Sequence, residues 1–157
     1  MNYIESNMTE EYLKQIINWK YSQEYEAYNL PSYEEMKVKG FSIVEPTKWS
    51  NYICFIGDND EVISFLNIVK QENNSIFLGI GIKPSYCGNG LGRIFLQKGI
   101  EEVKKRYGNT LITMQVRSWN KRAIKCYENI GFKITKTETE KDYKENVTEF
   151  VFMEYEI

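Results

Sequence analysis

The residues best suited to chemistry form a glycine-rich stretch between a predicted strand and a predicted helix, Cys87-Gly88-Asn89-Gly90-Leu91-Gly92-Arg93. Glycines at such a junction let consecutive backbone N–H groups converge at the start of the helix, where the dipole and the unsatisfied donors favour a phosphate or pyrophosphate. For the glycines alone, an ordinary turn that needs small residues explains the pattern equally well. The spacing matches neither a P-loop nor the GxGxxG pattern of dinucleotide-binding folds.

A second stretch, residues 116–132, contains Asn120 at the start of a predicted helix and Tyr127 on the apolar stripe of that helix. Taken singly, each residue has a structural explanation. Asparagine is a favoured N-cap, and a tyrosine on an apolar stripe is usually a core aromatic whose hydroxyl finds a partner. Neither residue by itself therefore indicates catalysis.

The chain contains no histidine, which excludes Ser-His-Asp and Cys-His nucleophile activation and histidine-ligated metal sites. Any general acid or base must be Glu, Asp, Tyr, Cys or Lys. The three cysteines form no CxxC pair, so no metal site is expected. We interpret Cys54 and Cys126 as small buried residues, and Cys87 as a loop filler at a helix start that would also stabilise a thiolate.

Composition predicts one soluble domain over residues 1–157. Twenty Lys and Arg against twenty-two Asp and Glu give a net charge of −2, so no broad basic surface for nucleic acid is expected. No apolar run approaches the roughly 20 residues of a membrane span, and the polar N-terminus does not resemble a secretion signal. The odd number of cysteines indicates a reducing compartment, and a cytoplasmic location is the expectation.

The pattern of apolar residues and turns predicts ten elements in the order α-α-β-β-β-α-β-α-β-β. Thr9 is expected to cap the first helix and Ser32 the second, where Glu35 completes a capping box. The expected ranges are helices 9–20, from 32 onward, 91–106 and 120–130, and strands 52–56, 61–69, 75–82, 110–116, 132–138 and 147–155.

Short turns between the first three strands predict an antiparallel meander. The strand-helix-strand crossover over 75–116 predicts one parallel pair. The fold class expected is therefore α/β (α+β), with a mixed, mostly antiparallel sheet of about six to seven strands flanked by helices.

Together, the two stretches and the strand pattern around them resemble the GNAT N-acetyltransferase superfamily over about residues 50–155. The family's cofactor motif is Arg or Gln, two residues, Gly, one residue, then Gly or Ala. Gly90 and Gly92 match this motif, while Cys87 replaces the Arg or Gln, which removes a side chain but leaves the backbone donors. The resemblance implies that acetyl-CoA is the cofactor and that its acetyl group moves to a primary amine by direct attack in a ternary complex.

The resemblance also implies the roles of individual residues. The backbone of Ile80, Gly81 and Ile82 pairs with the pantetheine arm, and Asn120 contacts the cofactor. Amine attack on a thioester develops an oxyanion and then a thiolate, so Ile82 N–H is expected to donate to the carbonyl oxygen and Tyr127 to protonate the sulfur. The pyrophosphate is expected to bind the amides of Gly88, Asn89, Gly90, Leu91, Gly92 and Arg93.

The general base is less obvious. In the ribosomal-protein N-terminal branch of the family a Glu before the second motif is the base, and Gln115 at the matching position cannot accept a proton. The base is therefore sought in Glu24, Glu26 or a water chain. The N-terminal run 19–31 is expected to build the acceptor pocket, with Glu24, Glu26, Tyr25 and Tyr28 binding a cationic amine. The alternative is that its aromatic residues pack the first helix onto the sheet and its carboxylates are solvated.

Two other functions fit the sequence. One is a weakly catalytic module that binds CoA esters, suggested by Cys87 and Gln115, and the other is a structural or protein-binding module. Small amines and a protein N-terminus both remain open as acceptors, because specificity depends on the N-terminal helices and loops. The aromatic-rich final strand offers an edge for a homodimer.

Overall fold

The computed structural model describes all 157 residues, which form two compact units. The first unit comprises Met1–Asn67 and Ile80–Leu91, and the second comprises Ile68–Gly79 and Gly92–Ile157. No helix is both long and apolar enough to cross a bilayer.

The first unit contains two short α-helices whose caps are those predicted from the sequence. The Thr9 side chain accepts the Tyr12 N–H at 3.2 Å at the start of α1 (Glu10–Ile17). Ser32 accepts the Glu35 N–H at 3.2 Å at the start of α2 (Tyr33–Lys39). The remaining elements that start in this unit are the strands β1 (Ile4–Ser6), β2 (Tyr52–Ile56) and β3 (Val62–Lys70) and the 3-10 helices η1 (Gln23–Tyr28), η2 (Ser42–Val44), η3 (Pro46–Asn51), η4 (Asp58–Asp60) and η5 (Pro84–Tyr86).

The core of the first unit forms where α1, α2 and β2 bury their apolar faces. Leu13 and Ile16 lie one turn apart on α1 and are both buried, as an amphipathic helix requires. Gln15 ties α1 to the start of β3, because its Oε1 accepts the Val62 N–H at 2.9 Å. The buried cluster consists of Met8, Leu13, Ile16, Trp19, Met36, Ile43, Val44, Tyr52, Cys54, Ile56 and Val62.

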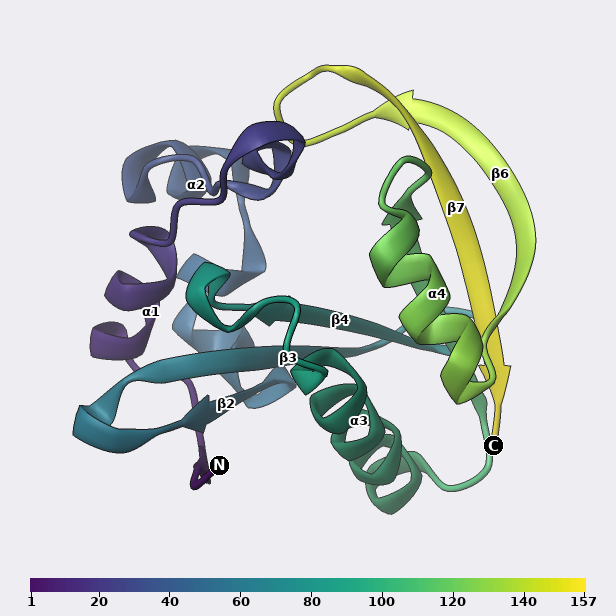
Figure 1. Ribbon diagram of the computed structural model, residues 1–157, viewed down its shortest axis with the longest axis horizontal. Helices are drawn as coiled ribbons and strands as arrows, with labels where there is room; N and C mark the ends of the chain where they lie inside the picture. Colours follow the sequence, from purple (N-terminus) through teal and green to yellow (C-terminus); the bar gives the residue numbers. More distant parts are fainter. The chain divides into compact units, whose positions relative to one another are not determined.

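The second unit contains most of α3 (Leu91–Tyr107) and all of β5 (Leu111–Arg117), α4 (Lys121–Ile130), β6 (Lys133–Lys141) and β7 (Val147–Glu156). Asn120 caps α4, and Gly131 follows its last residue. In Figure 1, α4 lies beside β7, and β6 and β7 form a long hairpin. Every residue of β6 is exposed, whereas Val151 and Met153 of β7 are buried.

Seven strands form one sheet in the order β1-β2-β3-β4-β5-β7-β6, in which β4 spans Ile76–Ile82. The pairing of β4 with β5 is parallel, and its register contains Ile76 with Ile112 and Phe77 with Thr113. Pairings β1–β2, β2–β3, β5–β7 and β6–β7 are antiparallel. The predicted mixed, mostly antiparallel sheet with one parallel crossover is thus confirmed.

The prediction missed one strand and misplaced the ends of two other elements by more than two residues. The sequence did not indicate β1, because three residues, two of them exposed, form no apolar pattern. Helix α1 ends at Ile17 rather than near residue 20, since Asn18 is its C-cap. Strand β6 continues to Lys141, beyond the predicted 138, because a strand exposed on both faces has no alternation that would mark its end.

Candidate active site

The predicted residues Ile80, Gly81 and Ile82 are the last three of β4, and side chains hold their backbone in place. The Ser64 hydroxyl donates to Gly81 O at 2.8 Å. The Tyr21 hydroxyl donates to Ile82 O at 2.6 Å. The next N–H along the chain, that of Lys83, donates to Ile63 O at 2.8 Å. Two consecutive peptide groups at the end of β4 are therefore fixed by hydrogen bonds.

Gly81 is required at its position by the ring of Phe65. A Cβ at residue 81 would lie 2.4 Å from Cε1 of Phe65 and 2.7 Å from its Cζ, well inside van der Waals contact. The Phe65 ring also stacks on Trp19 and contacts Tyr52, with centroid distances of 5.9 and 6.1 Å. Packing of aromatic side chains thus brings β3 close to the backbone of β4 where the site is predicted.

Strand β4 continues to Ile82, beyond the pairs that Ile76 and Phe77 form with β5. An extended chain can add to such a strand by main-chain hydrogen bonds, as a pantetheine arm with its two amides would. The geometry of β4 therefore suits the role that the sequence predicts for residues 80–82.

The glycine-rich loop that follows η5 has the open backbone that a phosphate needs. Gly88 and Gly90 have φ values of +81° and +76°, and a Cβ on either would meet nothing within 4 Å. Gly88, Asn89 and Gly90 are all exposed. Leu91 opens α3, whose first turn has N–H groups without intrahelical partners. This loop fits the pyrophosphate of a CoA cofactor.

Cys87, at the motif position where Arg or Gln was expected, faces the end of β4. Its Sγ lies 3.7 Å from Ile82 O and 3.6 Å from Lys83 O. These two contacts place the Cys87 side chain against the backbone at the end of β4, which suits the interpretation of Cys87 as a packing residue of the loop.

The turn that leads into this loop is anchored by a carboxylate that the sequence did not single out. Glu61 accepts hydrogen bonds from Lys83 Nζ and, at 2.8 Å, from the Tyr86 hydroxyl. These two hydrogen bonds, from Lys83 first and then Tyr86, lower the pKa of Glu61 below its usual value. Because Lys83 precedes η5 and Tyr86 is its last residue, these two contacts of Glu61 fix the connection between β4 and the glycine loop to the start of β3.

The N-terminal segment reaches the end of β4 through Tyr21. Besides its bond to Ile82, Tyr21 forms an edge-to-face pair with Tyr28, with ring centroids 6.3 Å apart, and its N–H donates to Asn29 Oδ1 at 2.7 Å. Tyr25 and Tyr28 of η1 are half-buried, whereas Glu24 and Glu26 are exposed. Packing of part of this aromatic run, the alternative interpretation of the sequence, is confirmed for the buried Trp19.

The other predicted site residues belong to the second unit. Asn120 is 8% exposed, and its Oδ1 accepts the Ala123 N–H at 3.2 Å, so it caps α4 as its type suggests. Tyr127 is 9% exposed and its ring lies 6.3 Å from that of Phe132. Gly92 and Arg93 lie in the first turn of α3. The structural roles of Asn120 and Tyr127 therefore accompany any catalytic role.

Gln115, which the sequence resemblance matches to the catalytic Glu of one branch, lies on β5, and its side chain is hydrogen-bonded to a carboxylate. Its Nε2 donates to Oε1 of Glu140 on β6 at 2.6 Å. Glu140 is exposed. A carboxylate thus stands one hydrogen bond away from the side chain that replaces the expected base.

A buried ion pair closes the β6–β7 hairpin onto the end of β5. Arg117 Nη1 lies 3.0 Å from Asp142 Oδ2, and the two side chains are 5% and 3% exposed. Burial opposes ionisation of Asp142, but the N–H groups of Asn146 and Lys144 and the Arg117 guanidinium outweigh it and lower the pKa of this carboxyl. The Arg117 guanidinium also lies over the Phe150 ring at 5.5 Å.

Sequence reasoning missed Ser64 and Glu61. It placed Tyr21 within the run 19–31 expected to build the acceptor pocket, but it did not predict the bond of Tyr21 to Ile82. Ser64 gave a weak signal, since it is a lone polar residue within the apolar run Val62–Leu66, and buried hydroxyls need a partner. No signal identified Gly81 as that partner. The chain holds no group of three or more His, Cys, Asp or Glu side chains arranged to bind a metal ion.

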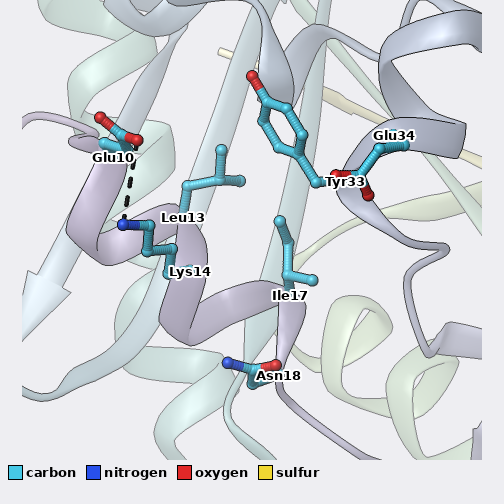
Figure 2. A pocket seen from close by; sticks show the side chains of 7 residues that line it. All are labelled: Glu10, Leu13, Lys14, Ile17, Asn18, Tyr33 and Glu34. Atoms are coloured by element: carbon cyan, nitrogen blue, oxygen red, sulfur yellow. Dashed lines mark ion pairs between the residues drawn. The ribbon is translucent and has the colours of Figure 1, made fainter.

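A separate pocket of about 270 Å³ lies on α1 and the start of α2 (Figure 2). Leu13, Ile17 and Tyr33 give it an apolar wall, and Lys14 forms a 4.0 Å ion pair with Glu10 at its rim. None of the predicted site residues lines this pocket, whose lining is Glu10, Leu13, Lys14, Ile17, Asn18, Tyr33 and Glu34.

Comparison with known proteins gives consistent matches. The model of the acetyltransferase (GNAT) family matches residues 12–132. The ribosomal protein bS18-alanine N-acetyltransferase of Escherichia coli is 31% identical over 103 residues, which cover 62% of this chain and 69% of the relative. A spermidine N-acetyltransferase chimera from Vibrio cholerae superposes with a TM-score of 0.77 at 16% identity, over 98% of this chain and 95% of the other. A phosphinothricin acetyltransferase from Sinorhizobium meliloti, solved with acetyl-CoA, gives a TM-score of 0.69 at 15% identity, over 100% and 89% of the two chains.

Proposed function

The chain belongs to the acetyltransferase (GNAT) family and is an acetyl-CoA-dependent N-acetyltransferase, and we propose that a primary amine attacks the thioester directly in a ternary complex. No side chain would be acetylated on the way. The observation that carries this proposal is the end of β4, where the peptide groups of residues 81–83 are held by Ser64, Tyr21 and Ile63.

Bound acetyl-CoA supplies the acetyl group, the thioester carbonyl and the sulfur leaving group. The N–H of Ile82 donates to the carbonyl oxygen as negative charge develops there, and a donor fixed in advance needs no reorganisation during the reaction. The backbone of Ile80–Ile82 pairs with the pantetheine arm. The amides of residues 88–93 bind the pyrophosphate, supported by the open left-handed geometry of Gly88 and Gly90. Since Asn120 Oδ1 caps α4, a cofactor contact by this residue uses its Nδ2.

Tyr127 is proposed as the acid that protonates the sulfur. A phenol with a reference pKa near 10 is protonated at neutral pH and can give its proton to a thiolate as it forms. Tyr127→Phe keeps the ring that packs beside Phe132 but removes the proton donor. We expect kcat to fall about 100-fold with an amine for which chemistry is rate-limiting, and the Kd of acetyl-CoA to stay within about twofold.

Tyr155→Phe is the matched control, because the Tyr155 ring also lies beside Phe132, with centroids 5.2 Å apart. Release of the CoA thiol, followed with a chromogenic disulfide reagent, measures turnover of both variants. Equal rates for Tyr127→Phe, Tyr155→Phe and the unmodified chain would refute the role of Tyr127.

Glu140 is proposed as the carboxylate that assists deprotonation of the amine, in place of the earlier candidates Glu24 and Glu26. The support is its 2.6 Å hydrogen bond to Gln115, which stands at the base position of the related branch. Glu140→Gln is expected to lower kcat/KM by about 100-fold, whereas Glu138→Gln, two residues away on the same strand, should have little effect. Similar rates for the two variants would contradict this assignment.

The acceptor is proposed to be a cationic primary amine, either a small molecule or a protein N-terminus. One relative is named as a ribosomal protein-alanine N-acetyltransferase, and one similar structure is named as a spermidine N-acetyltransferase chimera. Protein N-termini and polyamines are therefore the two classes of acceptor to screen first. The exposed carboxylates of Glu24 and Glu26 beside the half-buried Tyr25 and Tyr28 suit a positive charge. Glu24→Gln with Glu26→Gln should raise the KM of a polyamine more than that of a neutral aromatic amine, and equal changes would refute this pocket.

The two compact units are proposed to act as one domain over residues 1–157. The family match at residues 12–132 includes parts of both, and strands β3 and β4 each contribute residues to both. All three cysteines are free, which suits the reducing cytoplasm proposed from the sequence. The sequence expectation of a homodimer through the final strand is wrong for that strand, because β7 is paired with β5 on one side and β6 on the other and has no free edge. A homodimer through the edge strand β6 is proposed instead, and sedimentation measures it.

A further inference from the structure

Ser64 is a buried polar residue within an apolar strand. Its relative exposure is 0%, and its neighbours Val62, Ile63 and Leu66 are as deeply buried. A hydroxyl in such surroundings is destabilising unless it forms a hydrogen bond, and an apolar residue would fill the place without that requirement. The bond that Ser64 makes is a 2.8 Å donation to the carbonyl of Gly81.

This carbonyl belongs to the same peptide group as the N–H of Ile82. A peptide group is planar, and this chain contains no cis bond, so the Gly81 C=O and the Ile82 N–H point in opposite directions. A donor that fixes the carbonyl therefore fixes the direction of the N–H. Donation to the carbonyl also polarises the peptide group and strengthens the N–H as a donor.

The following peptide group is held as firmly. Tyr21 donates to Ile82 O at 2.6 Å and Lys83 N–H donates to Ile63 O at 2.8 Å, so this group is bound at both of its polar atoms. Rotation of the peptide group between Gly81 and Ile82 is thus limited from two directions. The bonds of Tyr21 and Ile63 hold the next peptide group, and the Ser64 hydroxyl holds the Gly81 carbonyl.

We propose that Ser64 is a positioning residue of the transferase, whose hydroxyl orients and polarises the Ile82 N–H toward the carbonyl oxygen of the thioester. The inference rests on the proposed function of Ile82. It assigns to β3 a side chain that acts on the reaction through a peptide group rather than by touching the substrate. Tyr21 donates to the adjoining peptide group, and Ser64 donates to the one that carries the Ile82 N–H.

The test measures the thioester carbonyl itself. Isotope-edited infrared difference spectra of acetyl-CoA labelled with carbon-13 at the carbonyl report the hydrogen bond as a shift to lower frequency on binding, with no acceptor amine present. With Ser64→Ala we expect at least half of this shift to be lost and kcat to fall about tenfold. The Kd of CoA, which lacks the carbonyl, should stay within about twofold.

Ser75→Ala is the matched control. Ser75 is also buried, and its hydroxyl donates to Gln71 and Asn73 in the turn between β3 and β4, next to the first residue of β4, whereas Ile82 is its last. It should leave the frequency shift and kcat unchanged. Ser64→Cys keeps a side chain of similar shape with a weaker donor, so its shift should lie between those of Ser64→Ala and the unmodified chain. This variant provides the measurement if Ser64→Ala does not fold.

The outcomes distinguish the positioning role of Ser64 from the donor role of Ile82. If the unmodified chain shifts the carbonyl frequency and the Ser64 variants shift it equally, the positioning role is wrong while the function of Ile82 stands. If the Ser64 variants bind CoA and acetyl-CoA equally more weakly and leave the carbonyl frequency shift unchanged, Ser64 has a structural role only. That result would also overturn the inference. If the unmodified chain binds acetyl-CoA without any shift, the proposed role of Ile82 fails first.

Discussion

Gly81→Ala is the substitution whose effect the structure predicts most directly. The new Cβ would lie 2.4 Å from Cε1 of Phe65, and ordinary contact begins at 3.4 Å, so one of them must move by 3.4 − 2.4 = 1.0 Å. The ring is confined by Trp19 and Tyr52, with centroids at 5.9 and 6.1 Å. Overpacking of this kind should destabilise the fold by about 2 kcal/mol.

Urea unfolding, followed by tryptophan fluorescence, measures this loss, and a Tm lower by about 6 °C should accompany it. Phe65→Leu shortens the side chain that the Cβ would meet. The loss in unfolding free energy of the double variant Gly81→Ala with Phe65→Leu should therefore be about 2 kcal/mol smaller than the sum of the losses of the two single variants. Activity should fall in Gly81→Ala beyond the loss of folded protein, because the displaced strand carries the N–H of Ile82.

Gly88→Ala provides the contrast. Its Cβ would meet nothing within 4 Å, but its φ of +81° is unfavourable for alanine, so about 1 kcal/mol is lost to the backbone alone. Phe65→Leu should not restore that loss. The clash between Gly81→Ala and Phe65 is refuted if the unfolding free energy of Gly81→Ala lies within about 0.5 kcal/mol of that of the unmodified chain. It is also refuted if the losses of Gly81→Ala and Phe65→Leu simply add in the double variant.

Asp142→Asn should destabilise the fold by about 3 kcal/mol in urea unfolding at neutral pH, because it leaves the buried Arg117 without its counter-charge. Since the folded-state pKa of Asp142 is lowered, its contribution is complete above the unfolded value near 4 and is lost as pH falls through the folded value. The stability gap between the two proteins should therefore narrow below about pH 4, and a constant gap would contradict the ion-pair explanation. Burial raises the pKa of Cys54 to about 12, so iodoacetamide should label it only upon unfolding. Peptide mass spectrometry checks this against Cys87, which is only half-buried, and equal labelling rates would show that the core opens locally.

The elements that the sequence predicts well are those with local signals. Thr9, Ser32 and Asn120 each cap a helix through an N–H three residues further on, so the whole interaction lies within one short window of sequence. The glycines at 88 and 90 likewise predict their own left-handed backbone. Strand β1 and the far end of β6 lack local patterns because they are mostly exposed, and only pairing with a neighbouring strand defines them.

The interactions that prepare the proposed oxyanion donor are all distant in sequence. Ser64 reaches across 17 residues to Gly81 and Tyr21 across 61 residues to Ile82, so no window of sequence contains either bond. The glycine motif could therefore be found from the sequence, but the side chains that orient β4 could not. They became visible only when β3 and the N-terminal segment were placed against that strand.

Cys87 shows why a departure from the family motif need not remove the cofactor site. Its sulfur faces the carbonyls of Ile82 and Lys83, while the donors expected to bind the pyrophosphate are backbone N–H groups of the exposed glycine loop. Any side chain at position 87 can leave those donors in place, provided that the loop keeps its left-handed glycines. Affinity for acetyl-CoA should consequently be more sensitive to Gly88→Ala than to Cys87→Ala. The reverse order, measured by calorimetry, would mean that a side chain rather than the backbone holds the cofactor.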